Sequence, residues 1–142
     1  MTAPITRPAN ADEFNTFQEG SLPALLGVVV QRVDASGVQA TLQIKPHHLA
    51  PNGFLHAATV VMLADTCCGY GCVANLPEGA KGFTTIELKS NHLGTATEGE
   101  IRCNATAVHL GRTTQVWDAT VHAPDGKAMA LFRCTQMVLW PR

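Results

Sequence analysis

Asp65 is the only formal charge between Phe54 and Asn75, in a stretch made almost wholly of apolar and small residues. Because an ionised carboxylate is costly to bury among apolar groups, it must be paired, neutralised or used in chemistry. We interpret Asp65 as the centre of an active site. The simpler alternative is a structural carboxylate that is paired with an arginine or capped by backbone donors.

The stretch around Asp65 is predicted to be a buried helix. It is too long and too uniformly apolar for a strand, and breakers at residues 75–79 follow it, so the helix runs from about residue 57 to about residue 75. A transmembrane helix would place Asp65 near the bilayer centre at a cost of about 2.5–3.5 kcal/mol. We therefore expect no membrane partner.

The rest of the chain has mainly strand character. Six segments have the alternation or composition of strands: residues 28–34, 38–45, 83–93, 98–109, 113–123 and 128–139. Turn sequences between the last three predict an antiparallel meander, and apolar residues around Pro23 predict a short helix or turn over the core. The order ββ-α-ββββ indicates an α+β fold, with a curved antiparallel sheet of about six strands wrapped around one long helix. We expect one domain, residues 1–142, in which residues 1–12 form a loose N-terminal arm.

The composition argues against several kinds of partner. Ten basic and eleven acidic residues give a net charge of −1 without any basic run, so we expect no nucleic acid. The five cysteines lack the spacing of a zinc site or a disulfide framework, so we expect reduced thiols and no metal. The N-terminal residues 1–20 lack the apolar segment of a secretory signal, which favours a cytoplasmic location.

Residues 48–58 read His-Leu-Ala-Pro-Asn-Gly-Phe-Leu-His-Ala-Ala, and Asp65 follows nine positions after His56. This pattern resembles the loop-to-helix motif of the hot-dog-fold acyl-CoA thioesterases, of the phenylacetate-degradation and 4-hydroxybenzoyl-CoA thioesterase type. Shorter likenesses at residues 109–113 and 125–127 extend the resemblance over nearly the whole chain. It implies a hot-dog fold and hydrolysis of an aryl- or acyl-CoA thioester, with coenzyme A as part of the substrate and no separate cofactor.

The resemblance implies catalytic roles for Asp65, Ala57 and His56. Asp65 would act as nucleophile or general base, and the unpaired N–H of Ala57 at the helix start would polarise the thioester carbonyl. For His56, the alternative is a structural role in which its ring nitrogens satisfy the loop. The candidate substrate contacts are Asn52, Gly53, Thr66, Cys68, Ser90 and Arg112, the last two as contacts to the coenzyme A phosphates.

Asp65 lies eight residues after Ala57, which corresponds to about 12 Å along one helix. That separation is too long for both residues to act on a single carbonyl. If two such helices pack antiparallel about a two-fold axis, Asp65 of one subunit approaches Ala57 of the other. We therefore expect a homodimer, or a dimer of dimers, with shared active sites.

Two other functions are compatible with the sequence. A hot-dog hydratase or dehydratase would use His56 and Asp65 as an acid–base pair on a carbon–carbon double bond. A non-catalytic acyl-CoA-binding module is favoured by three departures from the family pattern, since Ala50 replaces an asparagine and Ala57 and Ala58 replace two glycines. A serine hydrolase is disfavoured because the chain has no Gly-x-Ser-x-Gly elbow.

Overall fold

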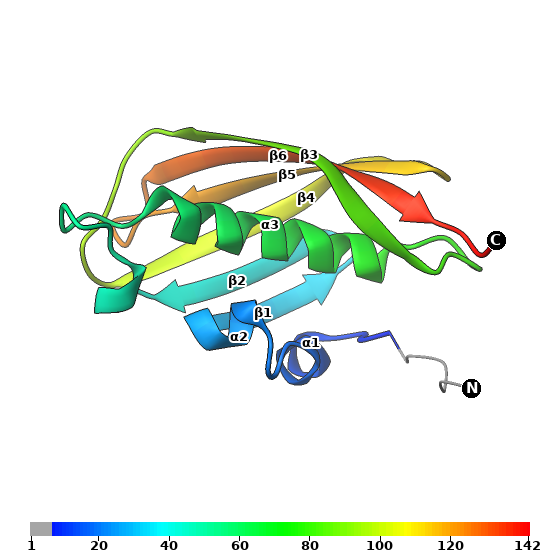
Figure 1. Cartoon of the computed structure of the whole chain (residues 1–142), viewed down its shortest axis with the longest axis horizontal. Helices are drawn as coiled ribbons and strands as arrows, with labels where there is room; N and C mark the ends of the chain where they lie inside the picture. The colour runs from blue at the N-terminus through cyan, green and yellow to red at the C-terminus, as the bar shows by residue number, and fades with distance from the viewer. Residues whose placement is uncertain (1–6) are drawn as a thin grey trace.

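A computed structural model describes residues 7–142 and shows one antiparallel sheet that curves around a long helix (Figure 1). The strands lie in the order β1-β2-β4-β5-β6-β3. Their bounds are β1 Val28–Asp34, β2 Gly37–Gln43, β3 Gly82–His92, β4 Glu100–Leu110, β5 Thr114–His122 and β6 Ala128–Leu139. The helices are α1 Ala11–Phe17, α2 Leu22–Leu26, α3 Ala57–Ala74 and the short 3-10 helix η1 Pro46–His48. The arrangement confirms the predicted α+β hot-dog fold.

Helix α3 lies against the inner face of the sheet and fills the core. Leu63 and Cys67 are fully buried, and Gly71 lies against the ring of Trp117 from β5. By length and composition α3 could cross a membrane, but 56% of it is buried within this fold. This burial supports the interpretation of α3 as a core helix.

The alternation predicted for the second strand is present in β2. Val38, Ala40 and Leu42 are at most 1% exposed and face the core. Thr41 lies on the other face and was expected to be exposed, yet it is only 4% exposed. Its hydroxyl accepts a hydrogen bond from Gln31 Nε2 at 3.1 Å, so its polar group is satisfied without water.

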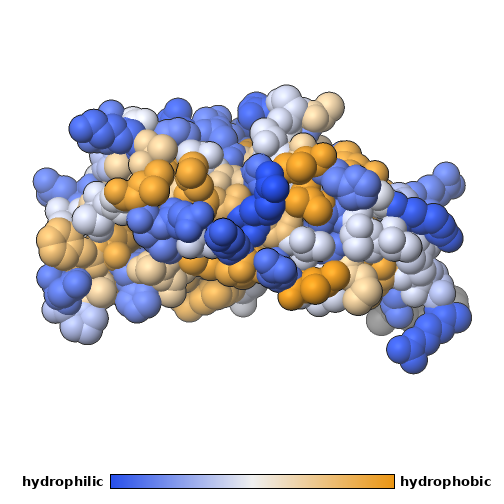
Figure 2. Space-filling view, turned by 90° about the horizontal axis from the view of Figure 1, so that it is seen from above, coloured by the Kyte–Doolittle hydropathy of each residue, from blue (hydrophilic) through white to orange (hydrophobic). Residues whose placement is uncertain are grey.

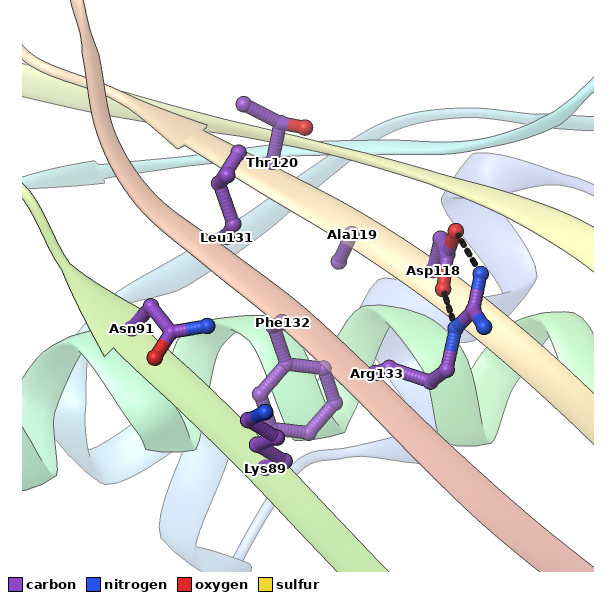
Figure 3. Close-up of a pocket in the computed structure, with 8 residues that line it drawn as sticks. All are labelled: Lys89, Asn91, Asp118, Ala119, Thr120, Leu131, Phe132 and Arg133. Atoms are coloured by element: carbon purple, nitrogen blue, oxygen red, sulfur yellow. Dashed lines mark hydrogen bonds and ion pairs between the residues drawn. The ribbon is translucent and has the colours of Figure 1, made fainter.

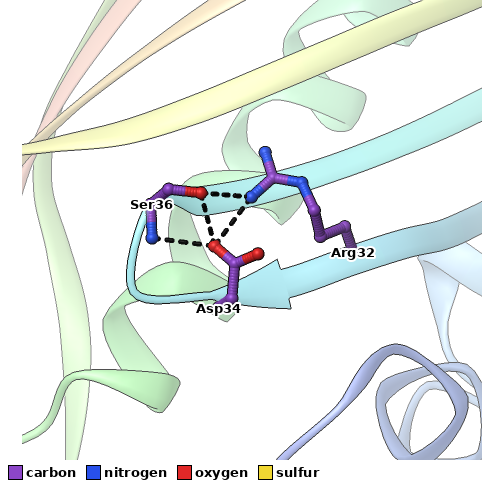
Figure 4. A network of polar contacts seen from close by, with 3 residues as sticks. All are labelled: Arg32, Asp34 and Ser36. Atoms are coloured by element: carbon purple, nitrogen blue, oxygen red, sulfur yellow. Dashed lines mark hydrogen bonds and ion pairs between the residues drawn. The ribbon is translucent and has the colours of Figure 1, made fainter.

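A polar network closes the hairpin between β1 and β2 (Figure 4). The Asp34 carboxylate accepts hydrogen bonds from the hydroxyl and N–H of Ser36 and from the Arg32 guanidinium. These contacts, with the Ser36 hydroxyl first, lower the pKa of Asp34 to about 2. Gly37 follows with φ of 133°, and a Cβ there would lie 2.0 Å from the Ala105 carbonyl oxygen, so the turn requires glycine.

The outer face of the sheet, seen from the side of β6 and β3, mixes apolar and charged side chains (Figure 2). Leu131 and Met137 of β6 are 44% and 42% exposed. Between them along the strand, Arg133 forms an ion pair with Asp118 of β5. Charged groups therefore interrupt the apolar surface on this side.

The N-terminal arm is shorter than the sequence predicts. Helix α1 begins at Ala11, where Asn10 Oδ1 accepts a hydrogen bond from Glu13 N–H, so the prediction of a loose arm is wrong for Ala11 and Asp12. Arg7 is also held, because its guanidinium donates to carbonyl oxygens in the connection between α3 and β3. Ala9 and Asn10 are hydrogen-bonded to Glu13 of α1, and residues 1–6 of the predicted arm lie outside the described residues.

The two edge strands differ in how their outer backbone groups are satisfied. At β1, Asn15 of α1 donates to the Val30 carbonyl at 2.9 Å and accepts from the Val30 N–H at 2.8 Å. Gln18 donates to the Val28 carbonyl at 2.6 Å. At β3, no hydrogen bond within residues 7–142 reaches the outer edge, and most side chains of the strand are exposed. The open edge of the sheet is therefore β3.

Candidate active site

The N-terminus of α3 presents a free backbone donor. His56 is the N-cap, and its Nδ1 accepts a hydrogen bond from the Ala58 N–H at 2.9 Å. Within residues 7–142 no hydrogen bond uses the N–H of Ala57, which is exposed. His56 thus holds the helix start, while the Ala57 N–H is left without an acceptor within residues 7–142.

A fully buried histidine fixes the loop that leads into α3. His48 Nδ1 accepts from the Lys45 N–H at 2.9 Å, and its Nε2 lies 2.6 Å from the Leu26 carbonyl oxygen. A neutral ring that carries its proton on Nε2 satisfies both contacts. Burial lowers the pKa of His48 and favours that neutral form. Its backbone carbonyl accepts from the His56 N–H and the Thr59 hydroxyl, which ties the loop to the helix start.

Asn52 and Gly53 form the exposed turn of that loop. Asn52 Oδ1 accepts a hydrogen bond from the Phe54 N–H at 3.1 Å, and Gly53 has a left-handed φ of 87°. The turn is closed by the Ala50 N–H, which donates to the Phe54 carbonyl at 2.7 Å. Both predicted residues thus lie in an ordered turn that precedes Ala57 by a few residues, and the conformation at position 53 requires glycine.

Asp65 lies in the middle of α3, on the side of the helix that the sheet does not cover. The residue is half-buried, and its Oδ1 atom is fully buried without a hydrogen-bond partner within residues 7–142. Desolvation raises the pKa of the carboxyl group. A buried carboxylate oxygen without a partner is costly, which is the condition expected of a group kept for chemistry rather than for stability.

Asp65 opens onto a cavity of about 230 Å³ between the helices and β3. Its lining comes from α1, α2, α3 and β3: Phe17, Pro23, Asp65, Thr66, Gly69, Tyr70, Val73 and Phe83. Thr66, a predicted substrate contact, is thus beside Asp65 in this cavity. The walls are mainly apolar, so the cavity places a carboxylate next to room for an apolar group.

Cys68 is not among the residues that line this cavity, and its role as a substrate contact stays a prediction. The side chain is fully buried and forms a hydrogen bond with Cys134 of β6. That contact and burial raise the pKa of the Cys68 thiol, which stays protonated. Asp65 and Cys68 are neighbours on the helix surface, but the boundary of the buried face passes between them.

Ser90 and Arg112, the predicted phosphate contacts, lie on different parts of the fold. Ser90 pairs with buried Phe132 across β3 and β6, and its hydroxyl is buried without a partner within residues 7–142. Arg112 stacks on Trp140, with its guanidinium carbon 4.2 Å from the ring centroid. It follows β4 at the C-terminal end of α3, because Gln115 in the next strand donates to the Asn75 carbonyl.

The strand neighbours of Ser90 face away from it. Lys89 and Asn91 line a pocket on the outer face of the sheet with the ion pair of Arg133 and Asp118 (Figure 3). Arg133 Nε and Nη2 lie 2.5 and 2.8 Å from the two carboxylate oxygens of Asp118. Because successive strand residues point to opposite faces, Ser90 cannot share a ligand with Lys89 and Asn91 on that face.

Several residues of the site had no signal in the sequence. Phe17, Pro23 and Phe83 line the cavity from three elements, but their apolar character predicts only that they are buried. His48 was part of the motif, yet its ring bonds to Leu26, which is distant in sequence and could not be paired with it in advance.

Comparisons with known proteins identify the family and the fold of the chain. The sequence model of the thioesterase superfamily matches residues 52–130, which is more than half of the chain and includes all of α3. PA1618 of Pseudomonas aeruginosa is 31% identical over 90% of this chain and 88% of its own length. A crystal structure of a mutant of thioesterase PA1618 superposes with a TM-score of 0.88 at 28% identity, covering 97% of this chain and 99% of that one.

Two further relatives have named activities. The 1,4-dihydroxy-2-naphthoyl-CoA hydrolase of Escherichia coli is 26% identical over 94% of this chain and 97% of its own length. The proofreading thioesterase EntH of Klebsiella pneumoniae is 27% identical over 88% of this chain and 90% of its own length. In all of these comparisons the similarity extends over nearly the full length of both chains.

Proposed function

This chain belongs to the thioesterase superfamily and is a thioester hydrolase, and from that premise we propose that it hydrolyses aryl- or acyl-CoA thioesters to the free acid and coenzyme A. One observation carries the assignment of the site. The Asp65 Oδ1 atom is buried without a partner beside a cavity that can receive an apolar acyl group.

In the proposed reaction Asp65 supplies the attacking group. It either attacks the thioester carbonyl carbon itself or removes a proton from a water molecule that does so. The carbon–sulfur bond then breaks, and coenzyme A leaves as a thiolate that takes up a proton. If water attacks, it provides the new oxygen of the acid directly; if Asp65 attacks, the acyl group forms a mixed anhydride with Asp65, which water hydrolyses to release the acid and restore the carboxylate. The raised pKa of Asp65 makes it a stronger base than an exposed carboxylate.

The negative charge that develops on the carbonyl oxygen needs a donor, and the Ala57 N–H is the candidate. His56 accepts from Ala58 and leaves the Ala57 N–H free, at the positive end of the α3 dipole. This donor is a backbone group, so it is present although alanine stands where the family pattern has glycine. The proposed role of His56 is to position this donor.

Ala57 and Asp65 of one chain cannot serve the same carbonyl, since eight helical residues separate them by about 12 Å. A second copy would supply the missing half of each site. The open edge of β3 supports such a dimer, because α1 satisfies the outer groups of β1 while those of β3 have no partner within residues 7–142. Pairing β3 with β3 of a second copy would continue the sheet about a two-fold axis.

A dimer also gives Arg112 a proposed role. Arg112 lies at the C-terminal end of α3, and α3 has 18 residues, so Arg112 is about 25 Å from Ala57 of the same chain along the helix. An antiparallel second helix would bring the partner copy of this arginine toward the first N-terminus. Ser90 lies in the half of β3 remote from Gly82, toward the start of α3 in its own chain, where the Leu55 N–H donates to the Ala96 carbonyl. We place both residues near the coenzyme A phosphates on that basis.

The test removes the two proposed groups one at a time. Ala57→Pro deletes the N–H but suits the first position of a helix, and His56 already has φ of −67° and ψ of 134°, as a residue before proline requires. We expect kcat to fall about 100- to 1,000-fold in Ala57→Pro and at least about 100-fold in Asp65→Asn. Ala57→Ser, which keeps the N–H, is the control. Normal kcat in a folded Ala57→Pro variant would contradict the proposed donor.

Mixing the two inactive variants tests the shared site. A hybrid dimer of one Asp65→Asn chain and one Ala57→Pro chain keeps one intact site, so random exchange restores about a quarter of the wild-type sites. Activity of each unmixed variant gives the baseline. No recovery after subunit exchange, with exchange shown by mass spectrometry of differently tagged chains, would contradict sites shared between subunits.

A further inference from the structure

Within residues 7–142, the side chains that line the cavity beside Asp65 carry polar groups only at Asp65, Thr66 and Tyr70. Phe17 of α1 and Phe83 of β3 contribute aromatic rings, and Val73 contributes a branched aliphatic side chain. The Thr66 hydroxyl lies 3.7 Å from the sulfur of Met62 on the preceding turn of α3. The polar side chains Asp65 and Thr66 are adjacent on α3, at the end of the cavity where the proposed function puts the thioester carbonyl.

Tyr70 has the one other polar group on the wall, and that group is already used. Its hydroxyl donates to Gln18 Oε1 at 2.7 Å in a buried hydrogen bond. Gln18 is 4% exposed, and its Nε2 donates to the Val28 carbonyl at 2.6 Å. The two hydrogen bonds link the Tyr70 hydroxyl, through the Gln18 amide, to the backbone of β1. Neither the hydroxyl nor the amide can therefore turn toward a ligand without breaking a buried hydrogen bond. The cavity is therefore lined by the ring of Tyr70.

The size of the cavity is set by a glycine. A Cβ added at Gly69 would lie 3.2 Å from Cζ of Phe83, so any larger residue at this position would take up space between α3 and the Phe83 ring of β3. The resulting space of about 230 Å³ exceeds the roughly 150 Å³ of an apolar cavity that holds benzene. A phenyl group, or an aliphatic chain of similar volume, fits.

We propose, on the basis of the function proposed above, that this cavity binds the acyl part of the substrate and selects apolar groups of about phenyl size over hydroxylated or carboxylated groups of the same size. A ring hydroxyl placed among Phe17, Val73 and Phe83 finds no hydrogen-bond partner in these three side chains, so any water that it gives up on entry is not replaced. A terminal carboxylate also meets the negative charge of Asp65. The α1–α2 segment, which contributes Phe17 and Pro23, thereby takes part in substrate selection.

The first experiment compares matched thioesters with the wild-type protein. Release of the coenzyme A thiol is followed for benzoyl-CoA, 4-hydroxybenzoyl-CoA, hexanoyl-CoA and succinyl-CoA. We expect kcat/KM for benzoyl-CoA to exceed that for 4-hydroxybenzoyl-CoA by about tenfold or more, as for a buried hydroxyl without a partner. Hexanoyl-CoA should resemble benzoyl-CoA, and succinyl-CoA should be the poorest. Equal or better turnover of the hydroxylated substrate overturns the proposal.

The second experiment narrows the cavity. Gly69→Ala should lower kcat/KM for benzoyl-CoA about tenfold, which is a large but common effect of pocket shape, and should leave acetyl-CoA nearly unaffected. Gly82→Ala is the control, because a Cβ there meets no atom within 4 Å. A Gly69→Ala variant that loses activity on both substrates equally, while thermal unfolding shows it is folded, also overturns the proposal.

Failure of selectivity and failure of the proposed function give different results. If the wild-type protein hydrolyses several thioesters, loses that activity in Asp65→Asn and yet prefers hydroxylated rings, the selectivity is wrong and the function stands. If no coenzyme A thioester is hydrolysed, or Asp65→Asn keeps full activity, the proposed function and site are wrong and the selectivity with them.

Discussion

The side chain of Asn15 bonds to both backbone groups of Val30, donating to its carbonyl and accepting from its N–H. A single residue of α1 thus replaces the neighbouring strand that β1 lacks. The same helix provides Phe17 to the cavity beside Asp65. Edge protection and the proposed substrate selection therefore involve the same short segment of the chain.

Replacing Asn15 with alanine should destabilise the fold. Two part-buried hydrogen bonds are lost and the outer groups of Val30 are left to water, so we expect a loss of about 1–3 kcal/mol in the free energy of unfolding. Urea denaturation followed by circular dichroism measures it. Thr16→Ala, a change at an exposed position of the same helix, is the control. Equal midpoints for the two variants would show that Asn15 does not stabilise the edge.

A charge on the open edge should weaken the proposed dimer. Ile86 of β3 is 57% exposed at an irregularity in the pairing with β6, and a lysine there would place two like charges near each other across a β3–β3 contact. We expect Ile86→Lys to dissociate at a higher protein concentration than the wild type in analytical ultracentrifugation. Leu25→Lys, at a 78% exposed position of α2, should not. Equal dissociation of both variants would argue against β3 as the interface.

Patterns within one element predicted the fold well. The alternation of β2, the turn glycine Gly37 and the long apolar run of α3 are local, and the observed bounds lie within a few residues of the predicted ones. The partners of each element are not local. Nothing in the sequence around Asn15 indicates that its amide meets Val30 rather than water, because that contact depends on how α1 folds back onto β1.

The site shows the same limit. Asp65 and Ala57 could be proposed because an isolated charge and a helix start can be read along the chain. Cys68 was predicted because its distance from Asp65 along the helix is short, but the direction of its side chain is decided by where the sheet lies, and it is fully buried. The cavity was missed because Phe17, Pro23 and Phe83 come together only in the folded chain.

Asp65 should make stability fall as the pH rises. Burial raises its pKa above the unfolded value, so the folded state keeps its proton to higher pH than the unfolded state does. The contribution of Asp65 to stability is fully present below the pKa that its carboxyl group has in the unfolded state. It is lost as the pH rises through the pKa of that group in the folded state. Asp65→Asn should lack this loss and be more stable than the wild type at neutral pH, in thermal unfolding from pH 3 to 8. Parallel profiles for the two proteins would show that the carboxylate is not strained by burial.

His48 should have the opposite pH dependence. Burial lowers the pKa of His48, so the unfolded state takes up a proton first as the pH falls. The contribution of neutral His48 to stability is present above the pKa of the unfolded state and is lost as the pH falls through the pKa of the folded state. His48→Asn should remove this dependence and, by breaking the contact with Leu26, cost about 2 kcal/mol at neutral pH. His47→Asn alters the exposed neighbour and serves as the control. Acid sensitivity that persists in His48→Asn would assign it to another group.

Gly71 should be the least tolerant glycine of α3. A Cβ there would lie 2.5 Å from Cη2 and Cζ3 of Trp117, whose Nε1 donates to Gln115 Oε1 at 2.8 Å. Gln115 in turn donates to the Asn75 carbonyl at the end of α3, so the ring cannot move away without breaking buried hydrogen bonds. We expect Gly71→Ala to cost about 1–3 kcal/mol, as overpacking does, in urea denaturation. Gly82→Ala, which adds its methyl group in open space, should cost far less. A stable Gly71→Ala variant would mean that α3 can shift away from β5, and the placement of Asp65 would then be adjustable as well.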